Sequence, residues 1–388
     1  MTASILTMKT RSQFTTTQDI VWEAKQNLPS DVWDYVTYGT ETETTLRRNR
    51  LALDSLALIP RVMRDVSRIN PASRFLDQSL RIPVILAPIG SLTLFDPDGG
   101  LAPAEVARDF GITHILSGYA APGYQEVGKR VPEKTLYALH PRPGLPPLGD
   151  LAKSVADAGF KAIVLVSETV FYTRRERDLM SKVKTAFQVE ELYSSLLRNV
   201  REMPEERQIT VEGLAGARMD WSMISDLKAH SGLKVIVKGI MSAEDARLAV
   251  EYGADAIYVS NHGGRALDHA PATIQMLPAI AETVGGQVDI IVDGGFVRGT
   301  DIIKAISLGA TAVGLGKLQA WALAAGGREG LYRLLELLEE EIVIAMALLG
   351  VNSLSELTPD CLQALSPVGN SHPLAAFPVV MERLGIAR

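Results

Sequence analysis

The sequence predicts an α/β fold, a TIM (β/α)8 barrel with an N-terminal helical cap and C-terminal helices, because three observations agree. Eight short apolar runs recur along the 388 residues, each run ends in glycine or polar residues, and helical patterns separate the runs. Short runs rich in β-branched residues are typical of parallel strands buried on both faces. Eight such strands alternating with helices match the strand number of a (β/α)8 barrel.

The eight predicted strands share an apolar body and a polar or glycine end. They are VILAPIG (84–90), THILSG (113–118), TLYALH (135–140), AIVLVSET (162–169), KVIVKGI (234–240), AIYVSNHG (256–263), DIIVDGG (289–295) and AVGLGK (312–317). Helical patterns such as AEDARLAVEYG and GTDIIKAISLGA lie between them. A doubly wound open sheet is the alternative, but the usual GxGxxG after the first strand is missing.

Three segments lie outside this repeat. Residues 1–80 contain DIVWEAKQNLPSDVWDYVTYG, which indicates short helices that cap the barrel formed by residues 81–388. The longest interval between strands, about 170–233, is highly charged in its first half, and we expect it to extend over the barrel mouth as a lid. LYRLLELLEEEIVIAMALLG, after residue 320, predicts one or two amphipathic helices.

Composition excludes several classes of protein. A net charge of −6 without a concentrated basic tract argues against a nucleic-acid binder. No apolar run has the ~18 residues of a membrane span, and the first residues lack the apolar core of a signal peptide. The single cysteine, Cys361, excludes an intrachain disulfide and a cysteine-based zinc cluster. We expect a cytoplasmic enzyme without a metal.

The carboxyl ends of the strands face the active site in this architecture. The residues at these ends are Pro88 to Gly90, Ser117, His140, Glu168, Lys238, His262 with Arg265, Asp293 with Gly294 and Gly295, and Gly316 with Lys317. The set contains a base, an acid, cations and three glycine-rich turns, and such a set indicates a catalytic site.

The last two strands predict an anion site. In VDGGFVRGTDIIKAISLGATAVGLGK, two glycine turns and a helix start follow adjacent strands. Backbone N–H groups at such positions bind anions, most often a phosphate. The alternative is that these glycines only permit tight turns between strand and helix.

Four charged or titratable residues predict the chemistry. Lys238 ends an apolar strand and needs a partner, either an ordinary carboxylate or an electron-rich cofactor ring. His262 and Arg265 suit a substrate carboxylate, with Arg265 binding the anion and His262 taking a proton. Glu168 is expected to orient His262. The alternatives are an ion pair of Arg265 with Asp268, and one of Glu168 with Arg174 or Arg175.

The residues SNHGGR, the preceding VKGI and AEDARLAVEYGADAI, and the following VDGGFVRGTDIIKAISLGA resemble the FMN-dependent α-hydroxy-acid oxidases and dehydrogenases. LPSDVWDYVTYGTETETTLRRNR and PVILAPIG resemble the N-terminal signatures of the same family, so the resemblance covers nearly the whole chain. It implies FMN as the cofactor, a (β/α)8 barrel and oxidation of an (S)-2-hydroxy acid to the 2-oxo acid.

The resemblance also assigns residues. It implies His262 as the catalytic base, Arg265 as the carboxylate-binding residue with help from Tyr35 and Arg175, and Lys238 at the N1/O2 edge of the flavin. The catalytic set is His262, Arg265, Glu168, Tyr35, His140 and Lys238, and the substrate contacts are Tyr35, His140, Arg175, His262 and Arg265. The cofactor set is Pro88, Ile89, Gly90, Ser117, Lys238, Ser260, Asp293, Gly294, Gly295, Arg298, Gly316 and Lys317.

The chain departs from the family pattern at several positions. Ala138 and His140 stand where the family has a Gln-x-Tyr, Glu168 replaces an aspartate, and Ala266 replaces a glutamine. Val297 and Lys317 stand where the family has phosphate-binding arginines, although Arg298 is adjacent. Losing one charge-assisted hydrogen bond costs roughly 1.5–3 kcal/mol, or about one to two decades of affinity. We therefore expect FMN to bind more loosely than in relatives, and the substrate to be altered.

Other functions fit parts of this pattern. One is an FMN enzyme of the same fold acting on a bulky, aromatic or pathway-specific substrate, and another is a catalytically degenerate binding protein. The phosphate turns also resemble inosine monophosphate dehydrogenase, but its catalytic cysteine has no counterpart within the barrel. We expect the partner to be a small carboxylate substrate, and we expect binding to neither nucleic acid nor a membrane. The family resemblance implies a homo-oligomer, either a tetramer or an octamer. The mechanism, hydride transfer or carbanion, and the acceptor, oxygen or another, stay open at this point.

Overall fold

The eight predicted strands form a closed parallel barrel in the computed structural model, which describes residues 13–141, 145–170, 173–181, 219–369 and 371–387. The strands are β4 (Val84–Leu86), β5 (Thr113–Ser117), β6 (Thr135–Leu139), β7 (Ala162–Val166), β8 (Lys234–Ile240), β9 (Ala256–Val259), β10 (Asp289–Val292) and β11 (Ala312–Leu315). Each pairs in parallel with its neighbours, and β11 closes the barrel on β4. The prediction of a TIM barrel is confirmed.

Burial explains why these runs become strands. Every residue of β4, β5, β6, β7, β9 and β11 is buried, because side chains on one face fill the barrel and those on the other pack against helices. The registers run without interruption except at β8, where the pairing with β9 shifts between Lys238 and Ile240. This irregularity lies at the carboxyl end of β8, beside the candidate site.

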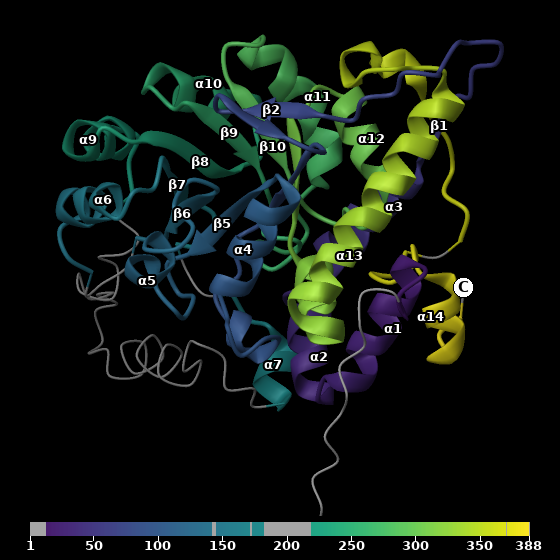
Figure 1. Cartoon of the computed structure of the whole chain (residues 1–388), viewed down its shortest axis with the longest axis horizontal. Coiled ribbons are helices and arrows are strands. Elements are labelled where there is room, and N and C mark those ends of the chain that lie inside the picture. Colours follow the sequence, from purple (N-terminus) through teal and green to yellow (C-terminus); the bar gives the residue numbers. More distant parts are fainter. Residues whose placement is uncertain (1–12, 142–144, 171–172, 182–218, 370, 388) are drawn as a thin grey trace, which may run out of the picture.

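A helix follows every strand of the barrel (Figure 1). These helices are α4 (Leu101–Phe110), α5 (Tyr124–Gly128), α6 (Leu148–Asp157), α9 (Ser222–Ser231), α10 (Ala243–Glu251), α11 (Thr273–Val284), α12 (Gly299–Ser307) and α13 (Lys317–Leu349). Helix α9 falls within the range predicted as a lid, but it packs beside α6 as a barrel helix does. The same range holds the short α7 (Glu176–Ser181), and its residues 182–218 lie outside the described residues.

The long helix α13 consists of two parts, which fits the expected one or two C-terminal helices. Its backbone leaves helical geometry at Gly326 and Gly327. The side-chain amide of Asn27, from the cap, donates to the carbonyl of Ala324 at 3.0 Å, just before this break. The carbonyls freed by the break are thus partly satisfied from the N-terminal segment.

Residues 13–80 pack on the outside of the barrel and on α13. Helices α1 (Thr17–Asn27) and α2 (Ser30–Thr37) pack on α13, α3 (Thr44–Asp54) packs on α11, and α14 (Pro378–Arg383) lies next to α1 (Figure 1). The rings of Trp33 and Trp321 stack at 5.6 Å and join α2 to α13. Strand β1 (Leu56–Leu58) pairs with β12 (Leu362–Ala364), which joins the two ends of the chain.

A short hairpin closes the amino end of the barrel. It is formed by β2 (Ser73–Phe75) and β3 (Gln78–Leu80). The Leu76 amide donates to Asp289, the first residue of β10, and Ser73 donates to the carbonyl of Thr311, which precedes β11. The site therefore faces the opposite, carboxyl end. None of the helices in the described ranges is long and apolar enough to cross a membrane.

Candidate active site

A buried cluster of charged groups lies at the carboxyl ends of β7, β8 and β9. The Lys238 ammonium contacts Oε1 of Glu168 and donates to the hydroxyl of Ser260 at 2.9 Å. Nδ1 of His262 lies 2.9 Å from the same Oε1, and the Ser260 hydroxyl donates to Asp293 at 2.7 Å. Glu168 thus pairs with Lys238 and His262, and the alternative pairing with Arg174 or Arg175 is wrong.

This geometry fixes the roles of the two nitrogens of His262. A carboxylate only accepts hydrogen bonds, so Nδ1 carries the proton that is donated to Glu168. Nε2 then keeps a free lone pair and is the atom that can accept a proton from a substrate. Gly239 makes room for this arrangement, because a Cβ at that position would lie 2.8 Å from Oε2 of Glu168.

The pKa values of the cluster follow from burial and charge. Burial acts to raise the pKa of Glu168, but the Lys238 ammonium and the bond to His262 hold that pKa well below its usual range. Burial, with the charge of Lys238 adding to it, lowers the pKa of His262 to about 4. Burial raises the pKa of Asp293. The cluster therefore holds a charged Glu168 and a neutral His262 at neutral pH.

The turn that carries His262 has an unusual backbone. His262, Gly263 and Gly264 have φ angles of +57°, +64° and +77°, in the left-handed region that favours glycine. A Cβ on Gly264 would lie 2.6 Å from the backbone of Leu46. The two glycines therefore let the turn bend under the cap, which places His262 at the site.

Two asparagines lock this turn to the cap. The side-chain amide of Asn49 donates to Asn261 at 2.9 Å, and that of Asn261 donates back to Asn49 at 2.8 Å. The Gly264 amide also donates to Oδ1 of Asn261. Both asparagines are buried, so a reciprocal pair satisfies groups that would otherwise be costly to bury.

Arg265 lies against the end of α2. Its guanidinium donates to the carbonyls of Tyr35 and Tyr38, the latter at 3.0 Å, and lies 4.7 Å from the centre of the Tyr35 ring. Asp178, on α7, is 3.8 Å away. The alternative pairing with Asp268 is wrong, because that carboxylate accepts from the Thr45 amide and the Thr42 hydroxyl.

Two of the other predicted substrate residues, Tyr35 and Arg175, lie beside Arg265. The Tyr35 hydroxyl donates to Ser91 at 3.3 Å, and Arg175 donates to the carbonyl of Arg265 at 3.4 Å. The ring of His140 lies 4.9 Å from that of Tyr119. Pro88, Ile89, Gly90 and the buried Ser117 follow or end β4 and β5 at the same barrel end.

The loop after β10 presents backbone amides rather than side chains. Gly294 and Gly295 have φ angles of +103° and +88°. No described residue accepts a hydrogen bond from the amides of Gly294, Gly295 or Phe296. A Cβ on Gly316, in the neighbouring turn after β11, would meet nothing within 4 Å. Consecutive unpaired amides beside open space suit an anion such as a phosphate.

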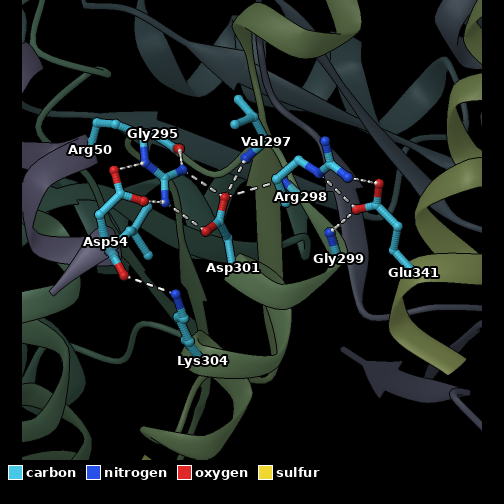
Figure 2. A network of polar contacts seen from close by, with 10 residues as sticks. Arg50, Asp54, Gly295, Val297, Arg298, Gly299, Asp301, Lys304 and Glu341 are labelled. Atoms are coloured by element: carbon cyan, nitrogen blue, oxygen red, sulfur yellow. Dashed lines mark hydrogen bonds and ion pairs between the residues drawn. The ribbon is translucent and has the colours of Figure 1, made fainter. Parts of the chain in front are cut away.

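The start of α12, which the sequence had suggested as part of the anion site, is already capped (Figure 2). Asp301 accepts from the amides of Val297 and Arg298, both at 3.1 Å, and Glu341 accepts from the amide of Gly299 at 2.7 Å. Two carboxylates occupy this helix end, so the unpaired donors of this loop are the glycine amides before it.

The cationic side chains near this loop are also engaged. Arg298 pairs with Glu341 at 2.7 Å, and Val297 is buried. Lys317 donates to the carbonyls of Thr37 and Gly263 at 3.0 and 3.2 Å. Neither Arg298 nor Lys317 points freely into the space beside the glycine turns.

The sequence did not indicate several residues that pack behind the site and fix the position of its loops. They are Asn49 and Arg50 on α3, Asp178 on α7, Thr273, which donates to the carbonyl of Asp293, and Asp301. Asp301 could have been found, because an aspartate at the third position of a helix is a capping signal. Arg50 pairs with Asp301 at 2.8 Å and donates to the Gly295 carbonyl at 3.2 Å.

Known proteins resemble this chain over most of its length. The sequence model of the family described as FMN-dependent dehydrogenase matches residues 24–364. Glycolate oxidase 3 of Arabidopsis thaliana is 35% identical over 338 residues, 86% of this chain and 92% of the relative. The 2-hydroxyacid oxidase of Dictyostelium discoideum is 32% identical over 349 residues, 89% of each chain. The structure of mandelate oxidase with (S)-4-hydroxymandelic acid is 33% identical and superimposes with a TM-score of 0.79, covering 92% of this chain and 100% of that chain.

Proposed function

Because the chain belongs to the FMN-dependent dehydrogenase family, we propose that it oxidises an (S)-2-hydroxy acid to the corresponding 2-oxo acid. The observation that carries this proposal is the shared contact of Glu168 with His262 and Lys238. It supplies a neutral, oriented base next to a buried cation. A carboxylate-binding arginine lies on the same turn as the base.

The described residues fit FMN. Lys238 is 2% exposed and stands at the end of a barrel strand, where a cation stabilises negative charge on a flavin ring. Ser117 and residues 88–90 lie at the same end of the barrel and line the site there. The amides of Gly294, Gly295 and Phe296 suit the phosphate. When bound, FMN supplies a ring that accepts two electrons.

The protein's own groups bind and deprotonate the substrate. Arg265, with Tyr35 and Arg175 beside it, binds the carboxylate and orients the hydroxyl-bearing carbon. Nε2 of His262 accepts one proton from that carbon or its hydroxyl, and Glu168 stabilises the resulting imidazolium. FMN, when bound, would take up the electron pair and the second proton, which balances the loss of two electrons and two protons from the 2-hydroxy acid. Oxygen or another acceptor would then restore the oxidised cofactor.

A proposal about the substrate rests on the third strand, where Ala138 and His140 stand in place of the Gln-x-Tyr that the family resemblance implies. Ala138 is fully buried and supplies only a methyl group, and His140 lies against Tyr119. An imidazole at this position leaves more room than a phenol. We propose that aromatic or branched 2-hydroxy acids are accepted.

The test is a spectrum followed by anaerobic reduction. Purified protein supplied with FMN is expected to show a flavin spectrum, and an (S)-2-hydroxy acid from a panel of aliphatic and aromatic acids is expected to bleach it. The (R) enantiomers serve as the control and should leave the colour unchanged. A protein that stays colourless with FMN, or a flavin that no 2-hydroxy acid bleaches, would contradict the proposal.

A further inference from the structure

Lys317 joins three segments that are distant in the sequence. It is the first residue of α13, directly after Gly316. Its ammonium donates to the carbonyl of Thr37, the last residue of α2, at 3.0 Å, and to that of Gly263, in the turn after β9, at 3.2 Å. Two of its three N–H donors are thus used by backbone carbonyls.

The two carbonyls belong to the segments that bind substrate. Gly263 lies between His262 and Arg265, and Thr37 lies two residues after Tyr35. Arg265 makes the same connection from the other side, since it donates to the carbonyls of Tyr35 and Tyr38. Two cations therefore hold the turn against the carbonyl end of α2, where the helix dipole favours positive charge.

The surrounding charge suits an incoming carboxylate. Burial, together with the charges of Arg265 and Arg175, lowers the pKa of Lys317 well below its usual range. Asp178 lies 3.8 Å from Arg265 and offsets part of this positive charge. A substrate carboxylate at Arg265 reduces the repulsion further, which couples anion binding to the integrity of the turn.

We propose that Lys317 is a positioning residue of the substrate site, which holds the turn of His262 and Arg265 against α2, rather than a ligand of the FMN phosphate. This inference deepens the proposed function and rests on it for the identity of the substrate. The phosphate is instead held by the backbone amides of Gly294, Gly295 and Phe296.

The test compares Lys317→Met with the wild-type protein in three measurements. Hydrogen exchange of residues 35–40 and 259–269 in the FMN-free protein should become faster. Oxalate, a small dicarboxylate, should bind the FMN-loaded variant about tenfold or more weakly, measured by its perturbation of the flavin spectrum. The ratio of FMN to riboflavin affinity, which isolates the phosphate, should change by less than about threefold.

Lys234→Met is the matched control, because Lys234 pairs with Asp77 at the opposite end of the barrel and should change none of the three. Lys317→Gln keeps a donor group, the side-chain NH2, and should give smaller changes in the same direction. This variant keeps the proposal testable if the methionine variant does not fold. A collapse of the FMN to riboflavin ratio overturns the proposal, and so does unchanged hydrogen exchange. These measurements need no turnover, so they stand even where no 2-hydroxy acid reduces the flavin.

Discussion

The turn after β9 (residues 260–265) and the loop after β10 (residues 293–299) are both rich in glycine, yet they are held in different ways. The β9 turn is held by amides and cations, through Asn49, Asn261, Arg265 and Lys317. The β10 loop is held by carboxylates, chiefly Asp301, which is itself paired with Arg50.

The difference matches what each segment presents. The β9 turn presents the side chains of His262 and Arg265, and its positive surroundings attract a carboxylate. The β10 loop presents backbone N–H groups, and the carboxylates behind it cap α12 and draw the Arg50 guanidinium into the interior. Glycine therefore has different roles in the two neighbouring loops. In the β9 turn it orients side chains, and in the β10 loop it leaves backbone N–H groups exposed.

Removing the base should abolish proton transfer at the β9 turn without disturbing the β10 loop. We predict that His262→Asn lowers the rate of flavin reduction by about 10²–10⁴-fold, because asparagine cannot accept the substrate proton. Asparagine tolerates the left-handed backbone at this position, so the turn should persist. Stopped-flow absorbance measures the reduction. FMN affinity and oxalate affinity should stay within a few-fold of wild type, and a loss of FMN would show that the two regions are not separable.

Removing Arg50 should disturb the β10 loop more than the β9 turn. We predict that Arg50→Met lowers the free energy of unfolding by about 3–5 kcal/mol, because it leaves the buried Asp301 without its ion pair. FMN affinity should fall as well, since the loop loses its anchor at the Gly295 carbonyl. Denaturant unfolding and fluorescence titration with FMN measure the two effects.

Arg247→Met is the control for this charge deletion. Arg247 forms an exposed pair with Glu251 on α10, and such pairs contribute less than about 1 kcal/mol. An Arg50 variant no less stable than this control would mean that the buried network does not hold the β10 loop.

Removing Lys238 should shift the pH dependence of kcat/KM, because it changes the pKa of His262 in the β9 turn. The pKa of His262 is lowered to about 4 by burial and by Lys238, so the base works above that pH and is lost as the pH falls through it. We predict that Lys238→Met raises this pKa and shifts the acidic limb of kcat/KM upward, toward the ordinary value of 6.5. Lys228→Met, which breaks a pair with Asp255 outside the site, should leave the limb in place. A limb that stays or moves downward in the Lys238 variant contradicts the assignment.

The barrel and the set of residues at its mouth could be predicted from the sequence because both follow a repeat. Each apolar run of a parallel barrel ends at the same face, so His262, Glu168 and Lys238 could be placed together from their strand ends alone. The contact between Glu168 and His262 was expected, but the sharing of one carboxylate oxygen with Lys238 depends on side-chain conformation, which has no periodic signal.

Contacts between the cap and the barrel could not be predicted. Asn49 and Asn261 are 212 residues apart, and Arg50 and Asp301 are 251 residues apart. A buried arginine and asparagine on a short helix look like surface polar residues in the sequence LRRNR, because nothing local distinguishes their faces. The orientation of Lys317 was missed for the same reason: its position after β11 suggested a phosphate, while its acceptors come from two distant segments.

The separation between Arg50 and Asp301 also sets an order for making the protein. Chains grow at about 5–20 residues per second, so Arg50 is synthesised roughly ten to fifty seconds before Asp301 exists. During that interval the cap helices lack their ion-pair partner, and for most of it they also lack the turn that they cover. The cap is thus made before the barrel that it covers, and its ion pair forms only after most of the barrel has been made. A nascent chain that ends before Ala312 lacks β11, so its barrel cannot close on β4.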